Sequence, residues 1–242
     1  MRAAGRSDIP PAGNFMKPDY RAETRRTLIT GPSGSGKTSA ALCLITSWKK
    51  KNPAGQLFVF DHKGEFSLRL PARQLSRPGQ MQAAFERGAT VVFNPHVCFT
   101  GSLDVAFQFF TDWTFLACSQ GPAREKLVVI DELQNFVGAA RSDIPRGLSC
   151  LAETGRCYRT SLLCIAQASN FVNNRLRSQF NQVLAFRQNE TRALDFLETC
   201  GLEKGEVASL PEKTCLLRQT ERLQTERYRL RFVRNRPRLE RI

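Results

Sequence analysis

Eight consecutive residues have the spacing of a loop that holds phosphate groups. Gly31-Pro32-Ser33-Gly34-Ser35-Gly36-Lys37-Thr38 matches the pattern G-x-x-x-x-G-K-[ST] at every fixed position. The glycines let successive backbone N–H groups turn towards a phosphate, and a helix that follows adds the partial positive charge of its N-terminus. Lys37 is expected to neutralise the β- and γ-phosphates of ATP, and Thr38 to offer its hydroxyl to Mg²⁺. The residues predicted to bind the nucleotide are Gly31, Pro32, Ser33, Gly34, Ser35, Gly36, Lys37, Thr38 and Ser39.

Two adjacent carboxylates follow a second apolar run, about ninety residues after this loop. Asp131 and Glu132 come directly after residues 127–130, Leu-Val-Val-Ile. A buried strand that ends in this way is typical of a Walker B segment, in which Asp131 would complete the magnesium shell and Glu132 would polarise the attacking water. The pair favours hydrolysis over simple nucleotide binding. A solvated Asp-Glu helix cap is the alternative.

A third apolar run ends in an amide. Residues 161–166 precede Gln167, whose side chain can donate and accept hydrogen bonds at the same time. It could therefore contact both the γ-phosphate and the water as a sensor. The alternative is a glutamine that only caps the next turn.

These side chains need a framework, and the hydrophobic pattern predicts one. Six short apolar runs lack polar alternation, as expected of strands buried on both faces of a mostly parallel sheet; they are residues 27–30, 57–60, 90–93, 127–130, 161–166 and 183–186. Helical spacing predicts helices over residues 38–51, 102–119 and 189–200, with Gly201 just beyond the third. The alternation predicts an α/β, doubly wound domain with helices on both faces of the sheet.

The ends of the chain differ from this alternating part. Residues 1–26 predict an irregular N-terminal arm, residues 27–233 a nucleotide-binding domain, and residues 234–242 a basic C-terminal tail. Within the domain, residues 214–217 and 228–233 predict edge strands that pair as a hairpin. The first 26 residues lack an apolar core segment, so we expect no secretion signal.

Composition and charge narrow the classes of function. The chain has 242 residues and a net charge of +14, of which residues 218–242 contribute +6. This excess favours a polyanionic partner such as nucleic acid, with a solvated basic surface as the alternative. Apolar runs such as residues 162–166 are far shorter than the ~20 residues of a membrane span. The eight cysteines form no Cys-x-x-Cys pair, so we interpret them as small core residues in a reducing compartment and expect no zinc site.

Taken together, the motifs resemble the FtsK/HerA superfamily of DNA-pumping ATPases, and within it the genome-packaging ATPases of membrane-containing icosahedral viruses. The resemblance covers about residues 27–219. It rests on the phosphate-binding loop, on Asp131-Glu132, and on three further segments, which are residues 58–65, residues 155–167 and Phe186-Arg187. Ala166 stands where the family commonly has threonine. The resemblance implies an additional-strand P-loop NTPase fold, like those of RecA and FtsK.

The same resemblance implies a mechanism and partners. It implies a ring of five or six subunits that hydrolyses ATP with Mg²⁺ at subunit interfaces and drives double-stranded DNA, without reading its sequence, into a preformed capsid. Capsid or portal vertex proteins would be partners, and the host cytoplasm or the virion the location. Arg156 and Arg159 match the family's arginine region and are expected to act in a neighbour's site, with phosphate-facing or solvated arginines as the alternative. Asp61 and Glu65 would tune the metal shell or couple it to DNA, with a plain turn as the alternative.

Other classes of function fit the sequence less well. A filamentous-phage assembly ATPase of the zonula-occludens-toxin type usually carries a membrane anchor, which the hydropathy does not predict. A cellular or plasmid DNA translocase is usually longer. A non-hydrolysing DNA-binding module would not need Lys37, Thr38, Asp131 and Glu132 together, and a small-molecule kinase typically carries an arginine-rich lid.

Overall fold

The computed structural model describes residues 16–19, 22–72, 75–138 and 143–242. The chain divides into two compact units. The first comprises Met1–Thr24, Ala54–Asp131 and Ile144–Leu162; the second comprises Arg25–Pro53, Glu132–Asp143 and Leu163–Ile242. Strand β5 (Thr160–Ala166) contributes residues to both.

The first unit is built on three parallel strands. They are β2 (Gln56–Phe60), β3 (Val91–Phe93) and β4 (Lys126–Ile130), in the order β3-β2-β4. Every residue of the three strands is buried, which explains why their sequences are apolar except at Gln56 and Lys126, the first residues of β2 and β4. Its helical segments are α2 (Glu65–Arg69), α3 (Gln80–Glu86), α4 (Pro95–Cys98), α5 (Leu103–Gln120), α6 (Arg146–Thr154) and the 3₁₀ segment η3 (Gly155–Tyr158).

Aromatic side chains fill the core of this unit. The Phe60 ring packs edge-on against Phe107 of α5, with ring centroids 5.1 Å apart, and lies 5.4 Å from the Phe110 ring. Phe58 meets Trp113 of the same helix in a similar arrangement. Such pairs add to the burial energy of large rings. The aromatic side of α5 therefore fixes this helix against β2, whose carboxyl end carries Asp61.

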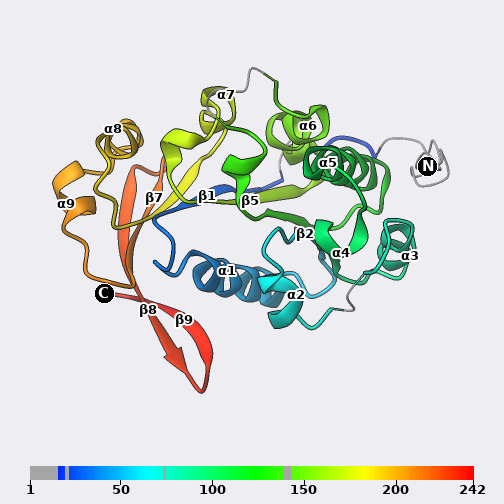
Figure 1. The fold of residues 1–242 in the computed structure, drawn as a ribbon, viewed down its shortest axis with the longest axis horizontal. Coiled ribbons are helices and arrows are strands. Elements are labelled where there is room, and N and C mark those ends of the chain that lie inside the picture. The colour runs from blue at the N-terminus through cyan, green and yellow to red at the C-terminus, as the bar shows by residue number, and fades with distance from the viewer. Residues whose placement is uncertain (1–15, 20–21, 73–74, 139–142) are drawn as a thin grey trace. The chain divides into compact units, whose positions relative to one another are not determined.

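The second unit carries the remaining strands in the order β1-β6-β7-β8-β9. Parallel pairing joins β1 (Arg26–Thr30) to β6 (Gln182–Phe186), whereas β7 (Thr214–Gln219), β8 (Gln224–Val233) and β9 (Arg236–Arg241) are antiparallel additions. Figure 1 shows α1 (Lys37–Lys51) on one face of these strands and α8 (Thr191–Thr199) on the other. The other helical segments are η2 (Leu133–Asn135), η4 (Ser169–Phe171), α7 (Asn174–Arg177) and α9 (Lys204–Ala208).

Most of the predicted elements are confirmed. The six apolar runs are β1 to β6, the three helical segments are α1, α5 and α8, and the predicted hairpin is β7–β8. Gly201 lies just past α8 with a φ of 86°, the left-handed conformation expected after a helix. The domain boundaries remain a prediction. Of the predicted N-terminal arm, residues 16–19 and 22–25 form neither helix nor strand, and residues 1–15 and 20–21 lie outside the described residues.

The predicted C-terminal tail is wrong, because residues 236–241 form strand β9. Arg234 and Asn235 have left-handed φ values of 50° and 59°, as a two-residue hairpin turn requires. Leu239 pairs with Leu230 across the two strands. The many arginines conceal this alternation in the sequence, since charged residues that face solvent from a strand look like a solvated tail.

The interpretation of the cysteines as core residues holds for four of them: Cys98, Cys118, Cys164 and Cys215 are buried, and the other four are partly buried. All eight are free thiols. Burial raises the pKa of Cys43 and Cys118 to about 11 and that of Cys215 to about 12, so these groups stay protonated at neutral pH. Within the described residues, no helix is long and apolar enough to cross a membrane.

Candidate functional site

The predicted phosphate-binding loop joins β1 to α1. Gly31, Gly34 and Gly36 all have positive φ values, of 154°, 76° and 112°. A Cβ atom on Gly31 would lie 2.7 Å from Cβ of Phe186, and one on Gly36 would lie 2.7 Å from Cδ2 of Leu230. Both positions therefore need glycine for space as well as for backbone conformation. At Gly34 no heavy atom lies within 4 Å of the added Cβ, so the loop is open there.

The side chain of Lys37 folds back onto the start of the loop. It is buried, and its ammonium group donates hydrogen bonds to the carbonyl oxygens of Gly31 at 2.7 Å and Pro32 at 2.8 Å. An ionised phosphate is a stronger acceptor than these neutral carbonyls. The lysine is thus held at the position from which it can turn to a phosphate, beside the N-terminus of α1.

Glu132 is held by two glutamine side chains of the same unit. The carboxylate is 2% exposed, and its residue has a left-handed φ of 49°. Its Oε2 atom accepts a hydrogen bond from Nε2 of Gln167 at 3.0 Å and a second from Nε2 of Gln134. Oε1 of Gln134 accepts from the backbone N–H of Gln167 at 3.2 Å. This glutamine clamp, formed by Gln134 and Gln167, fixes the direction of the carboxylate.

The clamp is attached to the phosphate-binding loop. The backbone N–H of Gly31 donates to the carbonyl oxygen of Gln167 at 3.2 Å. The structure therefore brings the loop, Glu132 and Gln167 together within the second unit. Gln134 was missed by the sequence analysis. Its position two residues after Glu132 was the available signal, but an amide inside a turn has many other uses.

Asp131 ends β4 in the first unit. The side chain is buried, and its Oδ2 atom accepts from the backbone N–H of Lys63 at 3.4 Å. Asp61, at the end of β2, accepts from the backbone N–H groups of Phe66 and Ser67 at 3.2 and 2.7 Å. Asp61 thus holds the first turn of α2, which is the plain turn that the sequence analysis left open.

The two predicted finger arginines have different surroundings. Arg159 binds Oδ2 of Asp19 through Nε at 3.0 Å and through Nη2 at 2.9 Å, and its Nη1 lies 3.7 Å from Glu125. Arg156, in η3, is exposed. Arg159 is therefore engaged within its own subunit, whereas the guanidinium of Arg156 faces solvent.

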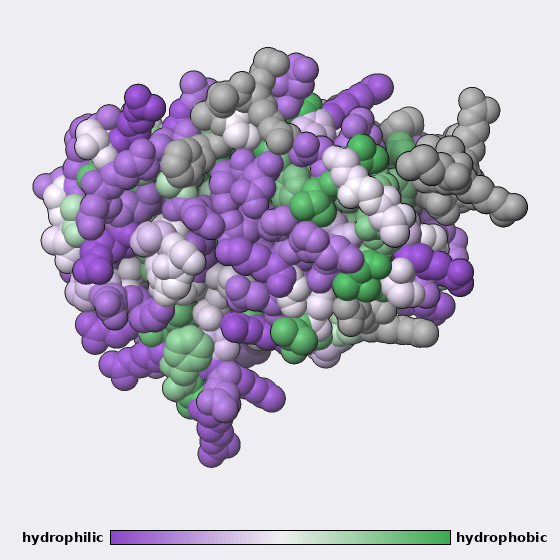
Figure 2. Space-filling model, viewed as in Figure 1, coloured by the Kyte–Doolittle hydropathy of each residue, from purple (hydrophilic) through white to green (hydrophobic). Residues whose placement is uncertain are grey.

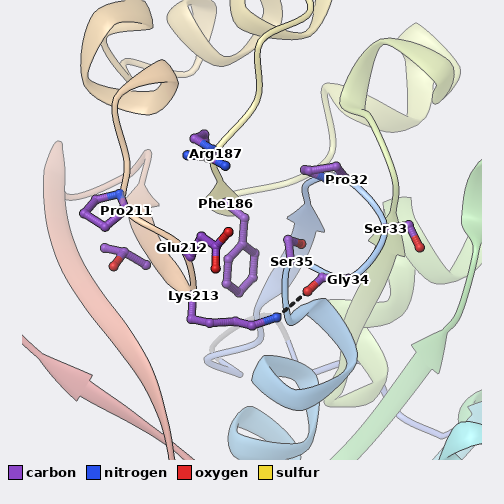
Figure 3. Close-up of a pocket in the computed structure, with 10 residues that line it drawn as sticks. Pro32, Ser33, Gly34, Ser35, Phe186, Arg187, Pro211, Glu212 and Lys213 are labelled. Atoms are coloured by element: carbon purple, nitrogen blue, oxygen red, sulfur yellow. Dashed lines mark hydrogen bonds between the residues drawn. The ribbon is translucent and has the colours of Figure 1, made fainter.

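A pocket of about 170 Å³ adjoins the loop (Figure 3). Its lining comes from the loop, the end of β6 and the start of β7, and comprises Pro32, Ser33, Gly34, Ser35, Phe186, Arg187, Pro211, Glu212, Lys213 and Thr214. Figure 3 shows the Lys213 side chain extending from the chain before β7 to the carbonyl oxygen of Gly34, to which its ammonium group donates. The carbonyl of Lys213 accepts from the N–H of Leu230 at 2.8 Å. Lys213 is therefore a second lysine that contacts the loop, and the sequence pattern did not predict this contact.

The donors present suit the predicted magnesium ion. Thr38 lies in the first turn of α1 and Asp131 at the end of β4, and hydroxyl and carboxylate oxygens are the hard ligands that Mg²⁺ prefers. Among the described residues, no group of three or more histidine, cysteine or acidic side chains could hold a metal ion alone. A magnesium site that uses phosphate oxygens and water needs no such group. The metal-binding and catalytic roles of these residues remain predictions.

Comparisons with known proteins agree with the motifs. The family model described as the type IV secretion-system coupling protein DNA-binding domain matches residues 17–95. The genome packaging NTPase B204 of Sulfolobus turreted icosahedral virus 2, in complex with sulfate, is similar with a TM-score of 0.68 and 13% identity, over 84% of this chain and 95% of that one. B204 of Sulfolobus turreted icosahedral virus, a DNA-packaging ATPase, matches with a TM-score of 0.62 and 15% identity, over 88% and 98% of the two chains.

A more distant match extends the comparison to plasmid proteins. The pCW3 conjugation coupling protein TcpA has a TM-score of 0.51 and 16% identity, over 81% of this chain and 58% of that one. No curated protein is similar to the chain in sequence. At these identities the solved structures establish the fold, an α/β P-loop NTPase fold with a mostly parallel central sheet. The chain is thus similar in fold to genome-packaging NTPases, and residues 17–95 match the coupling-protein model, in agreement with the resemblance inferred from the motifs.

Proposed function

We propose that this protein is an ATPase that translocates double-stranded DNA, and specifically a viral genome-packaging motor that works as a ring. The observation that carries the proposal is the arrangement of Lys37, Glu132 and Gln167 around one phosphate-binding loop. A loop that only binds nucleotide needs the lysine and the glycines. A buried carboxylate fixed by two amides beside it supports a further step, the activation of water.

The residues divide the chemistry of hydrolysis among them. Lys37 and the N–H groups at the start of α1 would bind the phosphates, and Glu132 would accept a proton from the attacking water. Gln167, which contacts Glu132, would orient that water. Thr38 and Asp131 would hold Mg²⁺, which when bound neutralises charge on the phosphate oxygens.

The pocket beside the loop supports the binding of a whole nucleotide. Phe186 offers an aromatic ring, and Arg187, Glu212 and Lys213 offer polar groups around it. Flat apolar surface with a few polar groups is what a base and its ribose require. We therefore place the nucleoside part of ATP in this pocket.

DNA as the cargo is supported by charge and by the comparisons. The chain carries a net charge of +14, and the family model that matches residues 17–95 describes a DNA-binding domain. The two B204 structures come from proteins that are described as packaging enzymes. A packaging role implies a ring of five or six subunits, capsid or portal vertex proteins as partners, and the virion or the host cytoplasm as the location.

The first experiment measures ATP hydrolysis with and without linear double-stranded DNA, at low and at moderate salt, on protein sized by light scattering. We expect turnover that DNA stimulates, in a ring-sized species, with a stimulation that weakens as salt rises. Lys37→Ala is the matched control for contaminating ATPases and should show no turnover. Turnover that ignores DNA in a monomeric protein would contradict the proposal.

A plasmid DNA translocase is the second candidate, because the matching family model is that of conjugation coupling proteins. Both candidates predict DNA-stimulated hydrolysis. They differ in location: a packaging motor should be found by mass spectrometry in purified capsids, whereas a coupling protein should be absent from them and required for plasmid transfer between cells.

A further inference from the structure

Strands β8 and β9 form an arm, and its second strand lies in the segment that the sequence predicts as a tail. It comprises residues 224–241 and turns at Arg234-Asn235. The register places Arg231 opposite Arg238 and Leu230 opposite Leu239. Residues directly opposite each other share a face of the sheet, and successive side chains alternate between the faces. The register therefore assigns every residue of the arm to one of two faces.

One face of the arm is basic. Its residues are Arg227, Arg229, Arg231, Val233, Arg236, Arg238 and Glu240. An ion pair joins Arg227 to Glu206 of α9 at 2.7 Å, and another joins Arg231 to Glu240 at 3.1 Å. Within the described residues, no acidic group pairs with Arg229, Arg236 or Arg238, and all three are exposed. The basic face thus presents three guanidinium groups without an ion pair, and Glu240, which lies opposite Arg229, pairs with Arg231 instead.

The opposite face is mostly apolar and attaches the arm to its unit. Leu230 is 4% exposed, and its Cδ2 lies against Gly36 at the start of α1. Farther along, Phe232 is 56% exposed and pairs with Pro237. In Figure 2 the lower projection, where Figure 1 places the arm, shows hydrophobic residues along its length and hydrophilic ones at its end. The apolar contact at Leu230 holds the arm while the basic face stays in solvent.

The basic face carries more positive than negative charge, with five arginines and one glutamate. Like charges directly opposite on paired strands repel each other, and Arg231 faces Arg238. A polyanion converts this repulsion into attraction, because each guanidinium fork can bind a phosphate with two hydrogen bonds. Alternate residues on a strand lie about 6.8 Å apart, which is the spacing of neighbouring arginines on the basic face. Phosphates on one DNA strand follow each other at ~3.4 Å of axial rise, so the arginines of this face can meet DNA phosphates at similar intervals.

We propose that the basic face of the β8–β9 arm binds the phosphate backbone of double-stranded DNA, without reading its sequence. The inference rests on the proposed function, in which DNA is the cargo, and adds the surface that contacts it. An anionic membrane fits less well, since the exposed ring of Phe232 lies on the other face from the arginines and the two could not lie on one lipid surface together.

The test is the binding of a labelled 30-base-pair duplex, followed by fluorescence anisotropy without nucleotide over a range of salt. The variant is Arg229→Gln/Arg236→Gln/Arg238→Gln. We expect its affinity to fall at least about tenfold, and the slope of log K against log salt to weaken by about 0.9 for each phosphate that the variant no longer neutralises. Lys50→Gln/Lys51→Gln/Arg192→Gln removes the same charge from exposed sites outside the arm and should leave both quantities within about twofold of wild type.

Two further measurements separate the explanations. The triple lysine variant, with Arg229, Arg236 and Arg238 each changed to Lys, keeps the charge and should retain most of the affinity, which a folding defect in the arm would not predict. Hydrolysis of ATP without DNA should be unchanged in all variants. If the triple Gln variant binds DNA with wild-type affinity, or if the control variant loses as much affinity, the basic face is not the DNA-binding surface. Either result leaves the proposed function itself untouched. Tighter binding of the wild-type protein to phosphatidylserine vesicles than to the duplex would also contradict the inference. If the wild-type protein does not bind DNA at all, both the inference and the proposed DNA cargo are wrong.

Discussion

At the scale of single residues, the site depends on how Glu132 is oriented. A carboxylate that accepts a proton from water must point in one direction, and the two amides of the glutamine clamp supply that constraint. The left-handed backbone at Glu132 is a strained conformation for a residue with a side chain, and such strain is commonly retained where function requires it. Two variants test this arrangement.

Glu132→Gln should retain ATP binding and lose hydrolysis. The amide keeps the size and the hydrogen-bonding reach of the carboxylate but cannot accept a proton at neutral pH. We expect kcat to fall by a factor of about 10² to 10⁴, the usual contribution of a general base, with the Kd of ATP little changed. Single-turnover hydrolysis and equilibrium nucleotide binding measure the two quantities. Normal turnover would show that Glu132 is not the base.

Gln134→Ala tests a positioning role. Removing one of the two amides leaves Glu132 less well oriented, and a hydrogen bond to a charged group contributes about 1.5–3 kcal/mol, so we expect kcat to fall roughly tenfold or more with KM nearly unchanged. Gln179→Ala is the matched control, since the side-chain amide of this half-buried residue contacts only Ser178 among the hydrogen bonds described. A rise in KM without a change in kcat would argue for a nucleotide contact instead.

At the scale of elements, the antiparallel strands after β6 shape the phosphate-binding loop from outside. Lys213, before β7, donates to Gly34, and Leu230 of β8 fills the space beside Gly36. The loop is thus packed against strands that lie about 180 residues later in the chain. Two glycines of the loop differ in this packing, which makes their substitution informative.

Gly36→Ala should destabilise the protein more than Gly34→Ala. Both residues have positive φ, so both substitutions introduce backbone strain of about 1–3 kcal/mol. Only at Gly36 does the new Cβ also meet a side chain, that of Leu230 at 2.7 Å. Denaturant unfolding gives the two free energies, and Gly36→Ala should cost less stability in a Leu230→Ala background than in the wild type. Equal decreases in the free energy of unfolding for the two substitutions would mean that the Leu230 side chain moves away from the new Cβ atom without loss of stability.

At the scale of the whole molecule, a ring would place an arginine of one subunit in the site of the next. Arg159 pairs with Asp19 and Glu125 of its own subunit, so Arg156 is the better candidate for such a role. Arg159 instead holds the chain before β1 to the segment before β5. Its side chain is 39% exposed, and exposed ion pairs contribute at most about 1 kcal/mol.

Arg156→Ala should abolish ATP hydrolysis in a uniform ring and regain part of it in mixed rings with Lys37→Ala subunits. In a mixed ring, some intact loops lie beside an intact arginine, which restores a complete site. Arg159→Ala is the comparator and should lower the free energy of unfolding modestly while keeping most of the activity. Mixing experiments with purified variants measure both. Failure of mixing to restore turnover would place Arg156 outside the neighbour's site.

Local sequence pattern was enough to identify the strands and the phosphate-binding loop. Strands buried on both faces are mainly apolar, so six of them could be recognised. The loop is a contiguous motif whose glycines, Lys37 and Thr38 follow from local backbone geometry. Asp131 and Glu132 were recognisable for the same reason, since they end such a strand.

Contacts between residues far apart in the chain became visible only in the folded protein. The contacts of Gln134 with Glu132, of Lys213 with Gly34 and of Leu230 with Gly36 depend on how strands and turns pack, which residue types do not encode locally. The same holds for β9, because arginines on one face of a strand have the composition of a solvated tail, and only pairing with β8 reveals their alternation. The side chains that meet at the site are brought together by contacts between segments far apart in the chain. A single sequence contains little information about such contacts.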